Sequence, residues 1–189
     1  MLLTIVGTNG PLFVFRKSTE TADFLSSHYP QFAKRSLGWQ LSVEEVYCLQ
    51  SRQDSCAEAG PGKAPDFAVS FEAASAVEQY TALRKAYASD CFIYSELTLR
   101  HGYKLRHGSS FGASYIGYRD LNEHGECLFF TGPLTALEQV RAVRTAHSVG
   151  KEAVMVLVVA EEAGVTLTRL GGGRAAPEVA HRRKIRRKE

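Results

Sequence analysis

Three side chains of types that take part in acid–base chemistry stand at the ends of apolar runs in the second half of the chain. Tyr118 ends a β-prone run, His124 opens the next apolar run after a short polar loop, and Lys151 stands just before the longest apolar run. A phenol, an imidazole and an ammonium group can exchange protons or stabilise negative charge. The spacing puts Tyr118 and His124 at the two mouths of one loop, but spacing alone does not bring Lys151 near them.

Each of these residues also has a purely structural interpretation. A strand tyrosine usually packs in a core or at its rim, His124 could be an ordinary loop histidine, and Lys151 could be a solvated charge at a strand end. Tyr115 is the local rival of Tyr118 as a reactive phenol. Three further histidines of this region are expected to be structural: His101, His107 and His147.

The elements around these residues predict a sheet flanked by helices. Short β-prone runs separated by Gly, Ser or polar turns fill residues 103–131 and indicate successive antiparallel strands. A helix opened by Pro133, a buried strand at 151–160 and a last strand at 165–170 follow. We expect these elements to belong to one domain, over residues 67–170.

The preceding part of the chain predicts a small α+β lobe with a linker, over residues 1–66. Two apolar runs near the N-terminus flank a turn that contains Asn-Gly-Pro, which indicates a hairpin. Ser42 and Glu45 form a capping box for a short helix. The Gly- and Pro-rich stretch from Asp54 is the candidate linker, and its Gly-Pro-Gly-Lys lacks the spacing and the Ser or Thr of a phosphate-binding loop.

Residues 68–100 are predicted to be mostly helical, because apolar residues recur at helical spacing. Their aromatic residues could suggest a base-stacking surface, but such a stripe more often packs in a core. The four aromatic residues concerned are Tyr80, Tyr87, Phe92 and Tyr94. The predicted fold class is therefore α/β, with a small N-terminal α+β lobe followed by a mixed-sheet lobe flanked by helices.

Composition indicates a folded, soluble protein. Of the 189 residues, 44% are hydrophobic and 23% charged, which is near the globular average. No apolar run has the length of a membrane span, and the N-terminus lacks the basic leader of an export signal. The four cysteines are scattered without the short spacing of a zinc or redox motif, so we expect a reducing compartment, no metal and no cofactor.

Positive charge is concentrated at the C-terminus. The last sixteen residues carry seven Lys or Arg and two Glu, which leaves a net charge of −2 on the rest of this +3 chain. Any nucleic-acid surface on the body must therefore be a local patch. We expect residues 171–189 to be a basic, disordered tail, which could bind phosphates, serve as a nuclear address or be merely solvated.

Four ordered motifs resemble the tRNA-intron (tRNA-splicing) endonuclease family over about residues 80–170. These are Leu-Arg-His-Gly-Tyr at 99–103, Phe-Gly-Ala-Ser-Tyr-Ile-Gly-Tyr at 111–118, the histidine before the next strand, and Arg-Thr-Ala-His-Ser-Val-Gly-Lys at 144–151. The sequence departs from the family pattern in three ways. Ser114 stands where the family has Asp, the loop before His124 is short, and Gly150 replaces a basic residue.

The resemblance implies an endoribonuclease of the domain type that cleaves precursor tRNA at intron boundaries without a metal. A ribose 2′-hydroxyl attacks its neighbouring phosphate, which gives a 2′,3′-cyclic phosphate and a 5′-hydroxyl. By the same resemblance Tyr118 is the general base, His124 the general acid and Lys151 the group that stabilises charge on phosphorus. An unperturbed tyrosine has a pKa of about 10, so a nearby cation must favour its phenolate.

The resemblance also implies RNA contacts and partners. Arg144 matches an arginine that stacks on a flipped RNA base, and Arg169 is the candidate for a second one, although Arg144 could instead pair with Glu138 or with solvent. The partners would be precursor tRNA and other endonuclease subunits, in a hetero-oligomer, or a homo-oligomer if the chain is archaeal-type. The strands at 154–160 and 165–170 are the expected interface. The location would be the nucleus, or the cytoplasm for an archaeal-type chain.

Two rival functions remain open at this stage. The first is a non-catalytic structural or RNA-docking subunit of the same complex, which the short loop and Gly150 favour and which the complete set of reactive residues disfavours. The second is a general RNA-binding module without catalytic activity.

Overall fold

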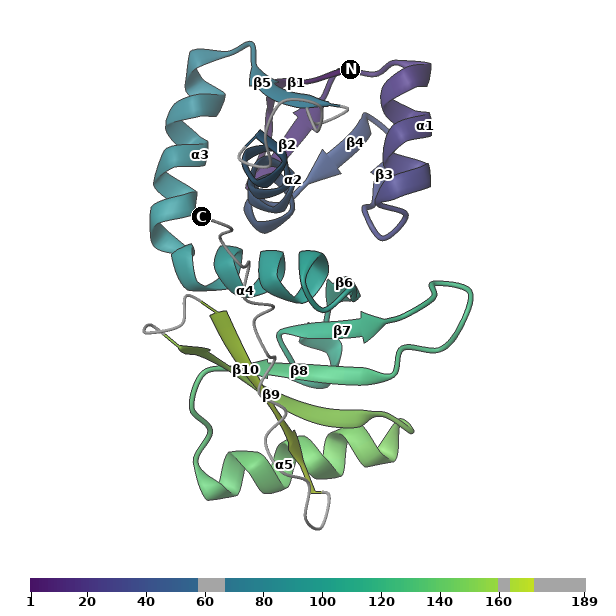
Figure 1. Ribbon diagram of the computed structural model, residues 1–189, viewed down its shortest axis with the longest axis vertical. Coiled ribbons are helices and arrows are strands. Elements are labelled where there is room, and N and C mark those ends of the chain that lie inside the picture. Colours follow the sequence, from purple (N-terminus) through teal and green to yellow (C-terminus); the bar gives the residue numbers. More distant parts are fainter. Residues whose placement is uncertain (58–66, 160–163, 172–189) are drawn as a thin grey trace, which may run out of the picture.

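The computed structural model describes residues 1–57, 67–159 and 164–171, and its described strands form two five-stranded mixed sheets, one in each lobe (Figure 1). The predicted α/β class is confirmed. The elements in chain order are β1 (Leu2–Asn9), β2 (Leu12–Phe15), α1 (Thr19–His28), β3 (Lys34–Arg35), β4 (Gly38–Leu41), α2 (Val43–Ala57), β5 (Ala68–Phe71), α3 (Ala74–Ala86), α4 (Ala88–Leu99), β6 (Lys104–His107), a 3₁₀ turn (Ser109–Phe111), β7 (Tyr115–Tyr118), β8 (Cys127–Thr131), α5 (Ala136–Ser148), β9 (Glu152–Val159) and β10 (Gly164–Leu170).

The first lobe begins with the predicted hairpin. β1 and β2 pair antiparallel across a two-residue turn in which Gly10 has a φ of 58°, a value that favours glycine. The capping box at the start of α2 is also confirmed. The backbone N–H of Ser42 donates to Glu45 Oε2 at 2.8 Å, and the backbone N–H of Glu45 donates to Ser42 Oγ at 3.4 Å.

The first sheet has the order β3-β4-β2-β1-β5, so it extends beyond the predicted boundary at residue 66. β5 pairs parallel with β1, from Leu2 opposite Ala68 to Ile5 opposite Phe71, and α3 packs against both strands. A four-residue strand in front of a helix has too little pattern of its own to show which sheet it joins. Residues 58–66 of the candidate linker lie outside the described residues.

The second sheet has the order β10-β9-β8-β7-β6. Its pairs are antiparallel except β8–β9, which is parallel because α5 carries the chain from one to the other. The predicted strands of this lobe are therefore confirmed. The start of α5 is a correction: the helix begins at Ala136 rather than at Pro133, because Thr135 and Glu138 form a capping box that fixes its first turn.

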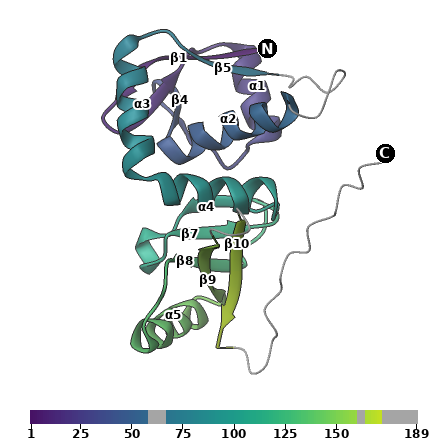
Figure 2. The ribbon, with the colours of Figure 1, turned by 60° about the vertical axis from the view of Figure 1, so that its left-hand side comes forward.

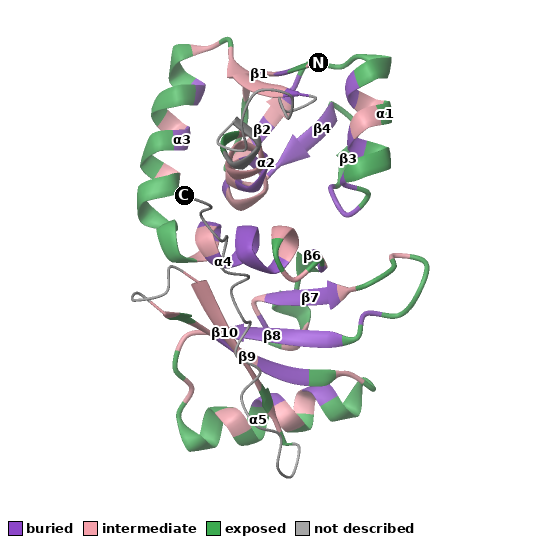
Figure 3. Cartoon of the chain, in the orientation of Figure 1, coloured by how far each residue is buried: buried purple, intermediate pink, exposed green. Residues whose placement is uncertain are grey.

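α4 lies between the two lobes (Figures 1 and 2), and Figure 3 shows that it is buried along most of its length. It packs on α2 of the first lobe and on β6, β9 and β10 of the second. One hydrophobic core consequently runs from the first sheet through α4 to the second sheet, while α5 covers the far side of the second sheet (Figure 2).

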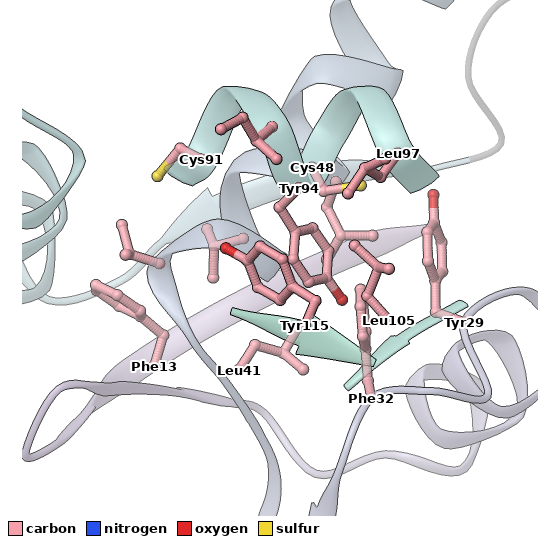
Figure 4. Packing of buried hydrophobic residues seen from close by; sticks show 14 of the residues in the cluster. Phe13, Tyr29, Phe32, Leu41, Cys48, Cys91, Tyr94, Leu97, Leu105 and Tyr115 are labelled. Carbon is pink, nitrogen blue, oxygen red and sulfur yellow. The ribbon is translucent and has the colours of Figure 1, made fainter. Parts of the chain in front are cut away.

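The aromatic residues expected in the core divide between core and surface. Tyr80 and Tyr94 are buried, Phe92 is half-buried, and Tyr87 is exposed. Figure 4 shows Tyr94 packed beside Tyr115, with Cys48 and Cys91 in the same cluster. Cys48, Cys91 and Cys127 are free thiols and are all buried.

Candidate active site

Tyr118 is the last residue of β7 and lies on the side of the sheet that α5 covers, where it packs against the smaller core cluster. The β6–β7 register puts Lys104 opposite Tyr118 and Arg106 opposite Ile116. Residues directly opposite one another share a face of a sheet, so both cations lie on the face of Tyr118. The Arg106 guanidinium carbon is 5.5 Å from the centre of the Tyr118 ring.

Tyr115, the rival phenol, lies on the opposite face of β7. It is 3% exposed, and its ring meets that of Tyr94 edge to face with 5.5 Å between centres. Burial raises the pKa of Tyr115 well above the usual value, so its phenolate is strongly disfavoured. Side chains alternate between the two faces of a strand, so Tyr115 and Tyr118, three residues apart, lie on opposite faces.

A compact loop returns the chain from β7 to β8. Asp120 Oδ1 accepts hydrogen bonds from the backbone and the side-chain amide of Asn122, which gives an Asx turn. After this turn the Glu126 N–H donates to the Gly117 carbonyl at 2.9 Å, which closes the loop.

Gly125 lies in contact with the Tyr118 ring. A Cβ added at Gly125 would lie 2.7 Å from Ile116 Cγ2 and 3.2 Å from Tyr118 Cε1 and Cζ, so the backbone approaches the ring more closely than other residues allow. Gly125 is itself buried. The sequence analysis missed this glycine, whose requirement arises only from the packing of the loop on β7.

The Lys151 side chain also reaches Gly125. Its side-chain Nζ donates to the Gly125 carbonyl oxygen at 2.6 Å. Gly150, with a φ of 65°, ends the turn after α5, and the backbone of Lys151 donates to the Ala146 carbonyl. The parallel pairing of β8 with β9 continues down to this end, where the Glu152 N–H donates to the Glu126 carbonyl at 2.8 Å.

His124 directly precedes Gly125 in the chain and is exposed. Its ring has no hydrogen-bond or ion-pair partner among the residues that the structure describes. The structure thus brings the three predicted residues to one backbone position: Tyr118 contacts Gly125, Lys151 donates to Gly125, and His124 is bonded to it.

Arg119 and Glu126 hold the two ends of the loop together. The Arg119 guanidinium carbon lies 3.8 Å from the centre of the Tyr103 ring, and Nη1 donates to the His101 carbonyl. Nε of Arg119 is 3.9 Å from Glu126 Oε2, and both side chains are about half exposed, so this ion pair is weak by itself. The stacking on Tyr103 adds a second attachment, and neither residue was identified from the sequence.

The predicted RNA-binding arginines lie in different surroundings. Arg144 is exposed on α5 and forms no ion pair within the described ranges, while the Glu138 carboxylate, its suggested partner, caps the helix through Thr135. Arg169 is on β10, where its Nε lies 3.2 Å from Glu152 Oε2. Arg169 stands opposite Val154 and therefore on the face away from Tyr118.

Ser114, at the position of the family aspartate, has a structural partner. Its hydroxyl lies 2.8 Å from the hydroxyl of Thr131 and joins the start of β7 to the end of β8. Among the described residues, no three His, Cys, Asp or Glu side chains converge as a metal site requires. Each helix in that part of the chain is too short or too polar to cross a bilayer.

A mixed sheet with Tyr118 and Lys151 in contact with Gly125 at one end, and with His124 next to Gly125 in the chain, defines an α/β domain with a candidate acid–base site. Residues 87–167 match the family model described as tRNA intron endonuclease, catalytic C-terminal domain. This part of the chain, which runs from the start of α4 into β10, is therefore similar to the catalytic domain of the tRNA intron endonuclease family. The match supports an endoribonuclease of tRNA splicing. No curated protein matches the chain.

Proposed function

We propose that this chain is a catalytic subunit of a tRNA-splicing endonuclease that cuts precursor tRNA at intron boundaries. The observation that carries the proposal is the convergence of Tyr118, His124 and Lys151 on the backbone of Gly125. The family match supports the class of substrate, since it covers the elements that position all three residues.

The proposed reaction is transesterification by the ribose 2′-hydroxyl, which leaves a 2′,3′-cyclic phosphate and a 5′-hydroxyl. Tyr118 takes the proton from the 2′-oxygen as that oxygen attacks phosphorus. Lys104 and Arg106 share the face of Tyr118, the Arg106 guanidinium lies 5.5 Å from the centre of its ring, and Lys151 donates to the carbonyl of Gly125, which contacts that ring.

His124 donates a proton to the departing 5′-oxygen. Its exposed position beside Gly125 leaves the imidazole open to a bound substrate, and an imidazole can carry a proton near neutral pH. The Lys151 ammonium exchanges its hydrogen bond with the Gly125 carbonyl for one with a phosphate oxygen and stabilises the developing charge. The proposed chemistry uses no metal, so cleavage is expected to continue in the presence of a chelator.

Arg144 and Arg169 are proposed to contact RNA. Arg144 has an exposed guanidinium that can stack on an unpaired base. Arg169 must first leave Glu152, but both side chains of that pair are more than half exposed, and such a pair opens at little cost.

The proposal includes an assembly with other endonuclease subunits, or with copies of the same chain if the protein is archaeal-type. β10 is an edge strand of the second sheet, and Val158 of β9 is exposed, so this edge offers both unpaired backbone groups and apolar surface. The proposed location is the nucleus, or the cytoplasm for an archaeal-type chain.

A non-catalytic structural or RNA-docking subunit is the second candidate. The short loop, the engagement of Ser114 by Thr131 and the absence of a basic residue at position 150 favour it. A general RNA-binding module would bind unrelated hairpins as well as a precursor tRNA with bulged splice sites.

The test compares His124→Ala and Lys151→Met in the assembled complex, with precursor tRNA, a chelator and analysis of the RNA ends. We expect His124→Ala to lower the cleavage rate by roughly 10²–10⁴-fold and Lys151→Met by roughly 10²–10³-fold. His147→Ala, at an exposed histidine of α5, is the matched control and should remain within a few fold of the parent. Unchanged cleavage in both test variants would establish the scaffold role.

A further inference from the structure

Two cations of β6 lie beside the candidate base but take no step in the reaction proposed above. Lys104 stands directly opposite Tyr118 in the β6–β7 register, and Arg106 stands opposite Ile116. Residues directly opposite one another share a face of a sheet, so Lys104, Arg106 and Tyr118 lie on the same face. Because β6 is an edge strand, the two cations stand at the margin of the sheet.

The helix that covers this face leaves the margin open. α5 packs mainly on β8, β9 and β10, at the other end of the strand order. In Figure 1, β6 and β7 lie on the side of β8 that is nearer α4 and farther from α5. Arg106 is exposed, and Lys104 and Tyr118 are half-buried. All three side chains therefore keep surface that a ligand can contact.

Both cations lack a counter-charge. The side chains of Lys104 and Arg106 form no ion pair and no hydrogen bond in the described part of the chain, whereas four arginines pair with carboxylates there: Arg16, Arg100, Arg119 and Arg169. Outside its last sixteen residues the chain has a net negative charge, so a generally basic surface does not explain two unpaired cations. Neighbouring like charges repel one another, and an anionic ligand offsets that repulsion.

The Tyr118 ring orients one of the two cations. The guanidinium carbon of Arg106 lies over this ring, 5.5 Å from its centre. A guanidinium over a ring keeps its N–H groups, which point outward in its own plane, available for hydrogen bonds. This fork of donors matches the oxygens of a phosphate group. Arg106 is thus held beside the candidate base with its donors unused.

The spacing of the two cations fits a nucleic-acid backbone. Lys104 and Arg106 are two residues apart on one strand, which separates their Cα atoms by about 6.6 Å. Successive phosphates of an extended RNA strand have a similar separation. A strand that runs along β6 can therefore place one phosphate on each cation, while Lys151, at the Gly125 carbonyl, is left for the phosphate that is attacked.

We propose that Lys104 and Arg106 form a subsite for the RNA backbone, in which they bind two successive phosphates beside the linkage that is cut. Contacts to phosphates position a strand without reading its sequence, so this subsite would fix the register of the RNA on Tyr118. The choice of RNA as the ligand rests on the proposed function, but the binding of phosphates does not depend on cleavage. An acidic protein segment is the alternative occupant.

The test measures binding of the full chain to a precursor tRNA that has 2′-deoxynucleotides at both splice sites and therefore lacks the attacking hydroxyl groups. Fluorescence anisotropy gives the association constant over a range of salt concentrations. We expect Arg106→Met and Lys104→Met each to weaken binding about tenfold. Each should also reduce the slope of log K against log salt by about 0.7, which is the value for one phosphate contact on a single strand.

Two further variants separate charge from packing. Arg84→Met is the matched control, because Arg84 is also exposed and lies over a tyrosine ring, 5.1 Å from the centre of Tyr47 in the first lobe. It should leave both the affinity and the slope as in the parent. Arg106→Lys keeps the charge and should keep most of the slope. Weaker binding with an unchanged slope in Arg106→Met would show that the residue acts only by packing on Tyr118, and would overturn the proposal.

The double variant Lys104→Met/Arg106→Met completes the test. Affinity and slope equal to those of the parent, or no binding by the parent itself, would also overturn the proposal, and the first result would leave the two cations to an acidic protein segment. A reduced slope in a protein that does not cut unmodified precursor tRNA would refute the proposed function and leave the phosphate subsite standing. Cleavage with an unchanged slope would do the reverse.

Discussion

Tyr115 and Tyr118 lie three residues apart on β7, but their side chains have different surroundings because they face opposite sides of the second sheet. Tyr115 faces α4, packs edge to face on Tyr94, and has its pKa raised by burial, as has Tyr94. Tyr118 faces the other way and has Arg106 beside its ring. The sheet therefore places one phenol where burial strongly opposes ionisation and the other beside the guanidinium of Arg106.

This difference shows how a small domain can place a candidate reactive site next to its core. The α4 side is dry and continuous with the first lobe, so groups that could ionise are kept neutral there. The opposite side ends in a loop whose glycine admits the Tyr118 ring and whose carbonyl receives Lys151. Only a few residues separate these two environments.

The largest effect is expected when the two phenols are compared directly. Tyr118→Phe should lower the cleavage rate by roughly 10²–10⁴-fold, because it removes the proposed general base, and should leave the melting temperature nearly unchanged. Tyr115→Phe removes the same hydroxyl from the buried side and should keep the rate within a few fold. Single-turnover cleavage of precursor tRNA measures both, and equal losses would remove the distinction between the two faces.

A smaller effect is expected at the glycine between Tyr118 and Lys151. The added methyl group of Gly125→Ala would meet Ile116 and the Tyr118 ring, displace the phenol, and lower the rate by about 10²-fold. Overpacking of this kind also costs about 1–3 kcal/mol of unfolding free energy. Gly7→Ala, where nothing lies within 4 Å of the added carbon, is the control for the substitution itself. An active Gly125→Ala variant would show that the close contact is dispensable.

The smallest effect is expected at Glu45, and it tests whether ionisable groups next to the core are kept neutral. Burial raises the pKa of Glu45 from 4.5 to about 7, against the opposing hydrogen bond from the Ser42 N–H. A carboxyl group with a raised pKa in the folded state stabilises the protein below pH 4.5, and that contribution is lost as the pH rises to 7. Glu45→Gln should therefore gain about 1–3 kcal/mol relative to the parent between pH 5 and pH 8.

Urea unfolding at the two pH values measures this gain. Glu20→Gln, at an exposed carboxylate in the first turn of α1, is the control and should show little pH-dependent difference from the parent. A constant difference between Glu45→Gln and the parent at both pH values would show that Glu45 is not held neutral by its surroundings.

Much of the fold could be predicted because its signals are local. The hairpin turn with Gly10 and the capping box of Ser42 with Glu45 each depend on a few adjacent residues, and both are present. The capping box of Thr135 with Glu138 is equally local, whereas the sequence analysis predicted the helix start at Pro133. The attachment of β5 to the first sheet depends on pairing with β1, more than sixty residues away, and no local pattern contains it.

The candidate site shows the same division. The types of its residues could be predicted from the sequence, whereas their meeting point could not. Lys151 lies beside Gly125 because β8 and β9 pair in parallel, and Arg106 lies beside Tyr118 because of the β6–β7 register. Both relations join distant segments. The roles of the three reactive residues stay a prediction.

The position of α4 has a consequence for how the protein tolerates change. A chain shortened to begin at α4 would keep all the reactive residues but would lose α2, which covers one side of this helix. Each fully buried apolar side chain that returns to water costs about 1.5–3 kcal/mol, and a few such losses equal the stability of a whole domain. Substitutions deep in the first lobe should therefore lower the amount of folded protein, although Tyr118, His124 and Lys151 all lie outside that lobe.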